Sequence, residues 1–308
     1  MKEKQNNISR EIALFISHLE SLREAFPVSM TVLETAKRRR EDDFQKFLNE
    51  KGESRKDGDK YSINIKSEHY KEFKTKNSRK ERYKMAQILV PRSLFVSMIS
   101  QYDAYLGRLL RAIFLLKPET ITDSEKTFLF KDISQFSSID DFKEHAVEKE
   151  IEVILRKSHE DQFKYMEKKF SINLRKELSV WSNFLEITER RNLFVHADGV
   201  VSKNYLEVCK QNGISVNNLI EGNSNLIVSQ EYFMQSYNCL YEIGLKLGHV
   251  LWRKLFPNDK EEADRAFNEA SIILIESEEY NLASEILDSA CNMWKNKFST
   301  EQYYLLQR

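Results

Sequence analysis

Arg191, Asn192 and His196 are the residues of this chain whose types and spacing best suit chemistry. They lie in the segment Glu189-Arg-Arg-Asn-Leu-Phe-Val-His196. A histidine titrates near neutral pH, whereas an arginine stays charged and presents a planar fork to phosphate oxygens. The segment therefore holds the groups needed for acid–base chemistry at a phosphate.

A helix is expected to carry these residues. Apolar side chains at spacings of three and four residues predict a helix over residues 174–197, with a face formed by Leu174, Leu178, Trp181 and Leu185. The polar break and permissive glycine of Ala197-Asp198-Gly199 would end it directly after His196.

The spacing limits how these groups can meet. Arg191 and His196 point roughly 140° apart around a helix, whereas Asn192 and His196 share a face. The two could converge if the long Arg191 side chain reaches around the helix, or if a second copy of the helix faces this one across a dimer axis. The structural alternative is that Arg191 forms a salt bridge near the helix end and His196 is a hydrogen-bonded terminal residue.

Two segments resemble the HEPN superfamily. RNLFVH within ERRNLFVHADG is similar to the Arg-x4–6-His signature that HEPN domains carry near the end of a helix. Ser93–Glu119, SLFVSMISQYDAYLGRLLRAIFLLKPE, resembles the first long helix of HEPN domains found in bacterial toxin and phage-defence proteins. The resemblance covers residues 89–257.

The resemblance implies an all-helical domain that forms a homodimer, in which both motifs line a shared cleft. It also implies an activity that is common among such domains, that of a metal-independent endoribonuclease without a cofactor. Arg191 and His196 would be the catalytic pair and Asn192 an orienting amide. The supporting residues would be Asp103, Glu189 and Arg190. Some HEPN families place a tyrosine two residues after the histidine; here that position is Asp198, whose role stays open.

The chemistry expected of such a pair follows from its side chains. His196 would remove the proton from an RNA 2′-hydroxyl or donate one to the departing 5′-oxygen, and Arg191 would stabilise the charge that builds on the phosphate. The products would be a 2′,3′-cyclic phosphate and a 5′-hydroxyl. This route needs no metal, and DNA would not be cut by it.

Two rival interpretations remain. One is an inactive HEPN module that binds RNA or nucleotide, or senses a partner. The other is a structural helical adaptor. For the active enzyme, the expected partners are RNA, a second copy of the chain, and an antitoxin or sensor protein.

Composition points to an all-α protein. Only 8 glycines and 4 prolines occur in 308 residues, of which 41% are apolar and 31% charged, a mixture typical of long helices in a soluble protein. The three cysteines show no metal-ligand spacing and indicate reduced thiols in the cytoplasm. No signal peptide or membrane span is expected.

Charge is balanced overall but uneven locally. The 48 basic and 48 acidic residues cancel, so the whole chain does not indicate a polyanion partner. Residues 51–84, however, contain 12 Lys or Arg and 6 Asp or Glu. This patch could bind phosphates at low salt; a solvated linker is the favoured alternative.

The chain divides into four predicted regions. Residues 1–50 would form N-terminal helices separated at Pro27, and 51–88 a charged linker or arm in which 61–65 alternates like a strand. Residues 89–257 would form the HEPN-like bundle, with helices at 92–117, 139–157, 174–197, 202–211 and 229–256. Residues 258–308 resemble a tetratricopeptide-type helix pair that docks on the bundle or on a partner.

Several single residues carry expectations of their own. Pro91 would start its helix, and Asp103, on an apolar face of that helix, needs a partner such as an arginine or a helix terminus. His145 and His159 lie among charged residues and are expected to face solvent. His249 is expected in the core, and a loop over 213–225 to close over the cleft.

Overall fold

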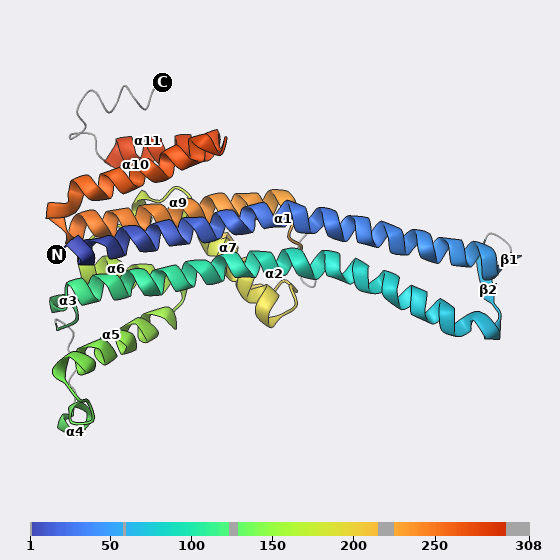
Figure 1. Cartoon of the computed structure of the whole chain (residues 1–308), viewed down its shortest axis with the longest axis horizontal. Helices are drawn as coiled ribbons and strands as arrows, with labels where there is room; N and C mark the ends of the chain where they lie inside the picture. Colours follow the sequence, from blue (N-terminus) through green and yellow to red (C-terminus); the bar gives the residue numbers. More distant parts are fainter. Residues whose placement is uncertain (1, 58–59, 123–128, 215–224, 294–308) are drawn as a thin grey trace.

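The computed structural model describes residues 2–57, 60–122, 129–214 and 225–293 (Figure 1). Over these ranges the protein is all-α apart from one two-stranded β-hairpin. The predicted fold class is therefore confirmed. None of the helices in the described ranges combines the length and apolar content that a bilayer crossing requires.

Two long antiparallel helices dominate the architecture. α1 (Lys2–Lys51) and α2 (Tyr70–Leu116) lie side by side and project together beyond the other helices (Figure 1). We call the projecting part, residues 28–90, the arm. Its tip is the hairpin of β1 (Gly52–Asp57) and β2 (Lys60–Ile65), in which Gly52 pairs with Ile65.

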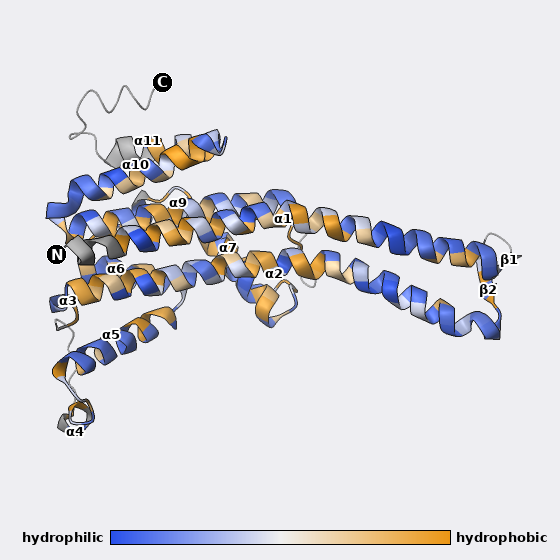
Figure 2. Cartoon of the chain, in the orientation of Figure 1, coloured by the Kyte–Doolittle hydropathy of each residue, from blue (hydrophilic) through white to orange (hydrophobic). Residues whose placement is uncertain are grey.

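The arm accounts for the charged segment 51–88. The predicted strand at 61–65 is confirmed within β2, and most of the remainder belongs to the outer half of α2. The ribbon of the arm has mostly the colour of hydrophilic residues in Figure 2. Its few apolar contacts hold the helices together, as where the Phe44 and Phe73 rings lie 5.7 Å apart.

Neither proline near the base of the arm ends a helix. The predicted break at Pro27 is wrong, because α1 runs through it, and so is the predicted start at Pro91, because α2 begins at Tyr70. A proline inside a helix costs about 3 kcal/mol. Continuous packing of α1 against α2 offsets that cost, and the Phe26 ring stacks 4.0 Å from Phe233 next to the first proline.

The register of the two helices sets both prolines near one level. An ion pair, hydrogen bonds and a ring contact link α1 to α2 in antiparallel order: Glu11 with Arg108, His18 with Gln101, Glu34 with Gln87, and Phe44 with Phe73. The same order brings Pro27 close to the level of Pro91. Both irregular points therefore coincide with the place where the arm leaves the body.

The body surrounds the inner halves of α1 and α2. α9 (Gln230–Leu255) packs on both, and the hairpin of α10 (Lys260–Glu276) and α11 (Tyr280–Met293) packs on α9. α5 and α7 pack on α2, with α6 in contact with both. The other body helices are α3 (Glu119–Thr122), α4 (Phe130–Ile133), α5 (Ile139–Leu155), α6 (His159–Phe170), α7 (Trp181–His196) and α8 (Lys203–Gln211).

The predicted helix starts at residues 139 and 229 agree with the observed starts of α5 and α9 to within one residue. Ser138 and Ser229 cap α5 and α9 by accepting hydrogen bonds from the amides of Asp141 and Tyr232, both at 3.1 Å. In the predicted C-terminal region, 258–308, the described residues form the two helices α10 and α11. Residues 294–308, and most of the loop predicted to close over a cleft, lie outside the described residues.

Two further histidine predictions can be checked. His249 is 1% exposed and contacts Asp264 at 3.0 Å, which confirms its place in the core. Burial, opposed by the hydrogen bond that His249 donates to Asp264, lowers the pKa of His249. His145 is exposed, as predicted.

We expect Gly244→Ala to destabilise the body by about 1–3 kcal/mol, as overpacking of a filled core does. A Cβ at this position would lie 2.1 Å from the Phe15 ring. That ring is fully buried and stacks 4.4 Å from Tyr105, so it cannot move aside. Urea denaturation of both proteins measures the difference.

Gly107→Ala is the matched control. Its Cβ would lie 3.2 Å from the terminal methyl of Leu155 and in ordinary contact with Ile151 at 3.8 Å, and alanine favours the helix more than glycine does. We expect a stability equal to or above that of the wild type. Equal stability of wild type and Gly244→Ala would show that the core around Phe15 is looser than described.

Candidate functional site

The helix that carries the motif is shorter than predicted. α7 begins at Trp181, and the preceding residues form a 3₁₀ turn at Arg175–Glu177. The Glu167 carboxylate accepts hydrogen bonds from the backbone amides of Leu174 and Arg175, at 3.0 and 2.8 Å. These bonds give the backbone an alternative to the helix, so the prediction of a helix from 174 is wrong at its start.

The end of α7 agrees with the prediction. The helix ends at His196, and Asp198 and Gly199 follow with φ angles of 49° and 80°. The Gly199 amide donates back to the Leu193 carbonyl at 3.0 Å. This left-handed turn fixes the direction in which the chain leaves His196.

Arg191 is held by an acidic residue of α2. Its Nη2 lies 2.6 Å from Asp103 Oδ2, and its Nη1 donates to Asn192 Oδ1 at 3.2 Å. The expectation that Asp103 needs an arginine partner is thus confirmed. Both side chains stay partly accessible, with 21% of Arg191 and 31% of Asp103 exposed.

A histidine binds the other oxygen of Asp103. His159 Nε2 lies 2.8 Å from Asp103 Oδ1, and only 10% of the His159 side chain is exposed. Its ring also packs against Tyr102 and Phe184. The prediction that His159 faces solvent is therefore wrong: this first residue of α6 turns inward toward α2, although its neighbours in sequence are charged.

His196 stands apart from this network. It is exposed and forms no hydrogen bond or ion pair with any described residue, whereas Asn192 is half-buried beside Arg191. Arg191 extends toward Asp103 rather than around the helix to the imidazole. Within one chain, Arg191 therefore does not reach around the helix to meet His196. Only the second route by which the two could converge, a dimer, is left.

Arg190 belongs to a second, more buried cluster. Its Nε donates to Glu186 Oε1 at 2.7 Å, and its guanidinium lies 3.7 Å from the centre of the Tyr232 ring. Glu186 also accepts hydrogen bonds from the hydroxyls of Tyr232 (2.7 Å) and Tyr205. The cluster ties α7 to α8 and α9.

Electrostatics support a permanent charge at the centre of this cluster. Burial opposes the charged guanidinium, yet interactions with Tyr232 and Glu186 raise the pKa of Arg190 above its ordinary value. Burial, reinforced by Glu186, raises the pKa of Tyr232 well above 10. Glu189, predicted beside Arg190 as a supporting residue, is half-buried and has no hydrogen bond among the described residues.

Arg92 fixes the segment after α7. Its Nη1 donates to the carbonyl (3.0 Å) and carboxylate (2.8 Å) of Asp198, and its Nη2 donates to the Leu226 carbonyl at 3.0 Å. The guanidinium also lies 5.1 Å from the Phe194 ring. Asp198, whose role the sequence left open, therefore anchors the end of the motif helix to α2.

The sequence missed four residues of these clusters: Arg92, Glu186, Tyr205 and Tyr232. A local signal existed only for Glu186, which precedes Arg190 by four residues, the spacing at which helical side chains of opposite charge meet. Within the described ranges no group of three or more His, Cys, Asp or Glu residues is arranged to hold a metal ion. Comparison of the chain with protein-family models, with curated proteins and with solved structures gives no match.

Proposed function

We propose that this chain is a HEPN-type endoribonuclease that cuts RNA through attack of the 2′-hydroxyl. The observation that carries the proposal is the arrangement at the end of α7. His196 is exposed in the last turn and forms no hydrogen bond with a residue that the structure describes, while Asp103 holds Arg191 beside Asn192 on the same helix. A proton carrier and a fixed cation thus occur on one short element.

The reaction uses these groups as follows. The His196 imidazole accepts the proton of the RNA 2′-hydroxyl, and the 2′-oxygen forms a bond to the adjacent phosphorus. The bond between phosphorus and the 5′-oxygen breaks, and that oxygen takes up a proton. Arg191 stabilises the negative charge on the phosphate oxygens, and Asp103 acts as a positioning residue for the guanidinium.

A homodimer completes the site in this proposal. Within one chain Arg191 reaches Asp103 and leaves His196 apart, so a second α7 has to bring its imidazole to the phosphate. Two-fold symmetry would give two equivalent histidines, one to accept and one to donate a proton. From the resemblance to toxin and phage-defence proteins, we propose a cytoplasmic toxin or antiviral role with an antitoxin or sensor partner.

Product analysis tests the proposal. The purified full chain is incubated with end-labelled RNA in the presence of EDTA, and the new ends are mapped. We expect a 2′,3′-cyclic phosphate and a 5′-hydroxyl, and no cutting at a position where a single 2′-deoxynucleotide replaces the ribonucleotide. Cutting at that deoxynucleotide, or a 3′-hydroxyl product, would contradict the mechanism.

One observation favours the rival proposal of an inactive module that binds RNA or senses a protein. Both terminal nitrogens of Arg191 are engaged, by Asp103 and Asn192, so a role in joining α7 to α2 already accounts for this arginine. This alternative would be established by an RNA that binds the chain but stays intact. The RNA should stay intact both with and without the protein encoded by a neighbouring gene, the candidate antitoxin or sensor partner.

A further inference from the structure

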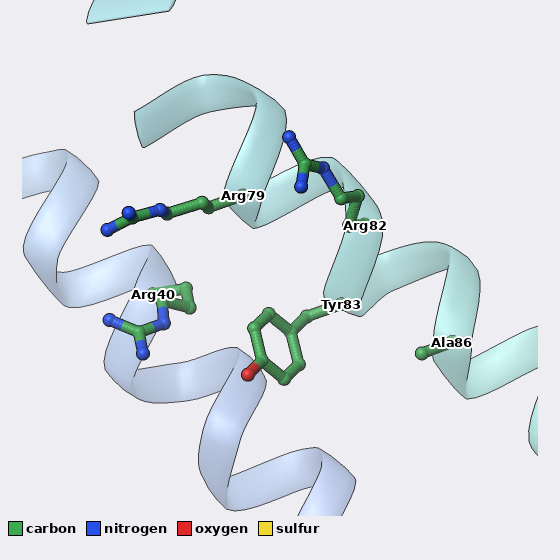
Figure 3. Close-up of a pocket in the computed structure, with 5 residues that line it drawn as sticks. All are labelled: Arg40, Arg79, Arg82, Tyr83 and Ala86. Carbon is green, nitrogen blue, oxygen red and sulfur yellow. The ribbon is translucent and has the colours of Figure 1, made fainter. Parts of the chain in front are cut away.

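A surface pocket of about 370 Å³ lies on the arm. It opens between α1 and α2 and is lined by Arg40, Arg79, Arg82, Tyr83 and Ala86 (Figure 3). Figure 3 shows Arg79 extending from α2 toward α1 and Arg40, with the Tyr83 ring beside them. Three of the lining side chains are cationic and none is acidic.

The two arginines that α2 contributes to this pocket have no ion-pair partner among the described residues. Arg40 donates to Asp43 at 3.2 Å and lies 5.8 Å from the Tyr83 ring. Arg79 and Arg82 are exposed and form no ion pair with any residue in the described part of the chain. An exposed guanidinium without an ion-pair partner can bind two oxygen atoms of one phosphate group through its planar fork.

The positive charge continues along the helix. Lys71, Arg79 and Arg82 lie within about 80° of one another around α2, and the first and last are about 16 Å apart along its axis. Small residues at Thr75, Ser78 and Ala86 occupy the same face. The cations therefore form a line suited to an extended polyanion rather than to a single ion.

The charge of the whole chain directs such a ligand to the arm. Residues 28–90 contain 17 Lys or Arg and 11 Asp or Glu. Because the complete chain is neutral, the remaining residues carry an equal excess of negative charge. A polyanion is thus attracted by the arm more strongly than by the rest of the surface.

We infer that the arm pocket binds the phosphodiester backbone of RNA, with Arg79 and Arg82 contacting phosphate groups. This site is separate from Arg191 and His196, and only the choice of RNA among phosphodiesters rests on the proposed function. Lys71 extends the contact toward the tip of the arm. Contacts of this kind carry no sequence information and weaken as salt rises.

Binding is measured by fluorescence anisotropy, with fluorescein-labelled oligouridylate and the full chain carrying His196→Ala so that the RNA stays intact. We expect Arg79→Gln with Arg82→Gln to weaken binding roughly tenfold at low salt and to reduce the slope of log affinity against log salt by about 1.4, as loss of two phosphate contacts predicts. Arg38→Gln is the matched control. Arg38 lies in the arm, 76% exposed and paired with Glu34 at 3.1 Å, so we expect unchanged affinity.

The possible failures are distinct. Equal binding by the double variant and its parent, or an equal loss in Arg38→Gln, would overturn the arm site. A second failure would be displacement of the RNA by inorganic phosphate at a concentration equal to that of the phosphate groups in the RNA. This result would show that the pocket binds a single ion and would overturn the proposal that it binds the RNA backbone. An intact RNA that the wild type binds through Arg79 and Arg82 but never cuts would overturn the proposed cleavage and leave the arm site standing.

Discussion

We expect RNA cleavage to fall by about 10²–10⁴-fold in His196→Ala, the range that a general acid–base residue contributes, while the fold stays unchanged. His196 is exposed and has no hydrogen bond within the described part of the chain, so its removal should alter the free energy of unfolding by less than about 0.5 kcal/mol. Single-turnover cleavage of labelled RNA measures the first effect and urea denaturation the second. His145→Ala, which removes another exposed histidine, should retain full activity.

Arg191→Ala separates the catalytic from the structural interpretation of the motif. The substitution leaves Asp103 with His159 as its only remaining partner in the network, so some stability is lost together with activity. His196→Ala has no such structural cost. Unaltered cleavage by a folded His196→Ala protein would therefore remove the imidazole from the mechanism, and failure of that variant to fold would assign it a structural role.

Glu186→Ala destabilises the protein by about 3–5 kcal/mol, the cost of leaving a buried charge without its partner. The carboxylate is 9% exposed and binds Arg190, which is 14% exposed. It also accepts the hydroxyl protons of Tyr205 and Tyr232, and both hydroxyls would lose a partner. The midpoint of urea unfolding at constant slope reports the change.

Two further variants on α7 serve as controls for Glu186→Ala. Glu189→Ala removes a half-buried carboxylate that makes no hydrogen bond to a described residue, and should cost less than about 0.5 kcal/mol. Glu186→Gln keeps a hydrogen-bond acceptor but loses the negative charge. Its loss in the free energy of unfolding should lie between those of Glu189→Ala and Glu186→Ala. A Glu186→Ala protein within 1 kcal/mol of the wild type (about the value of one ordinary hydrogen bond) would show that the cluster is not a main link between α7, α8 and α9.

How far the sequence predicted the fold depends on the range of the interactions involved. Ser138, Ser229 and the Asp198-Gly199 turn act on their own backbone neighbours, so the helix ends they set were predicted. The continuity of α1 through Pro27 was not predicted. It depends on packing against α2, whose facing residues lie far away in the sequence. Rules based on neighbouring residues predict that a proline ends a helix, and only packing against the paired helix offsets the free-energy cost of keeping it inside one.

The candidate site divides in the same way. The need of Asp103 for a cation followed from its apolar neighbours on one helix, and Arg191 meets it. His159 was assigned wrongly because the charges beside it in sequence describe the exposed side of α6, whereas its partner lies 56 residues earlier. Arg92 and Leu226 meet across 134 residues, a separation that no periodicity reveals.

α2 carries Arg82 and Asp103 on one unbroken helix. Twenty-one residues at a fixed rise set these two positions about 32 Å apart along the axis. The helix fixes this distance, so a polymer that contacts both Arg82 and the Arg191 side chain held by Asp103 must extend across that interval. Lengthening or shortening the rod by whole turns would change the span while keeping both side chains near their original faces.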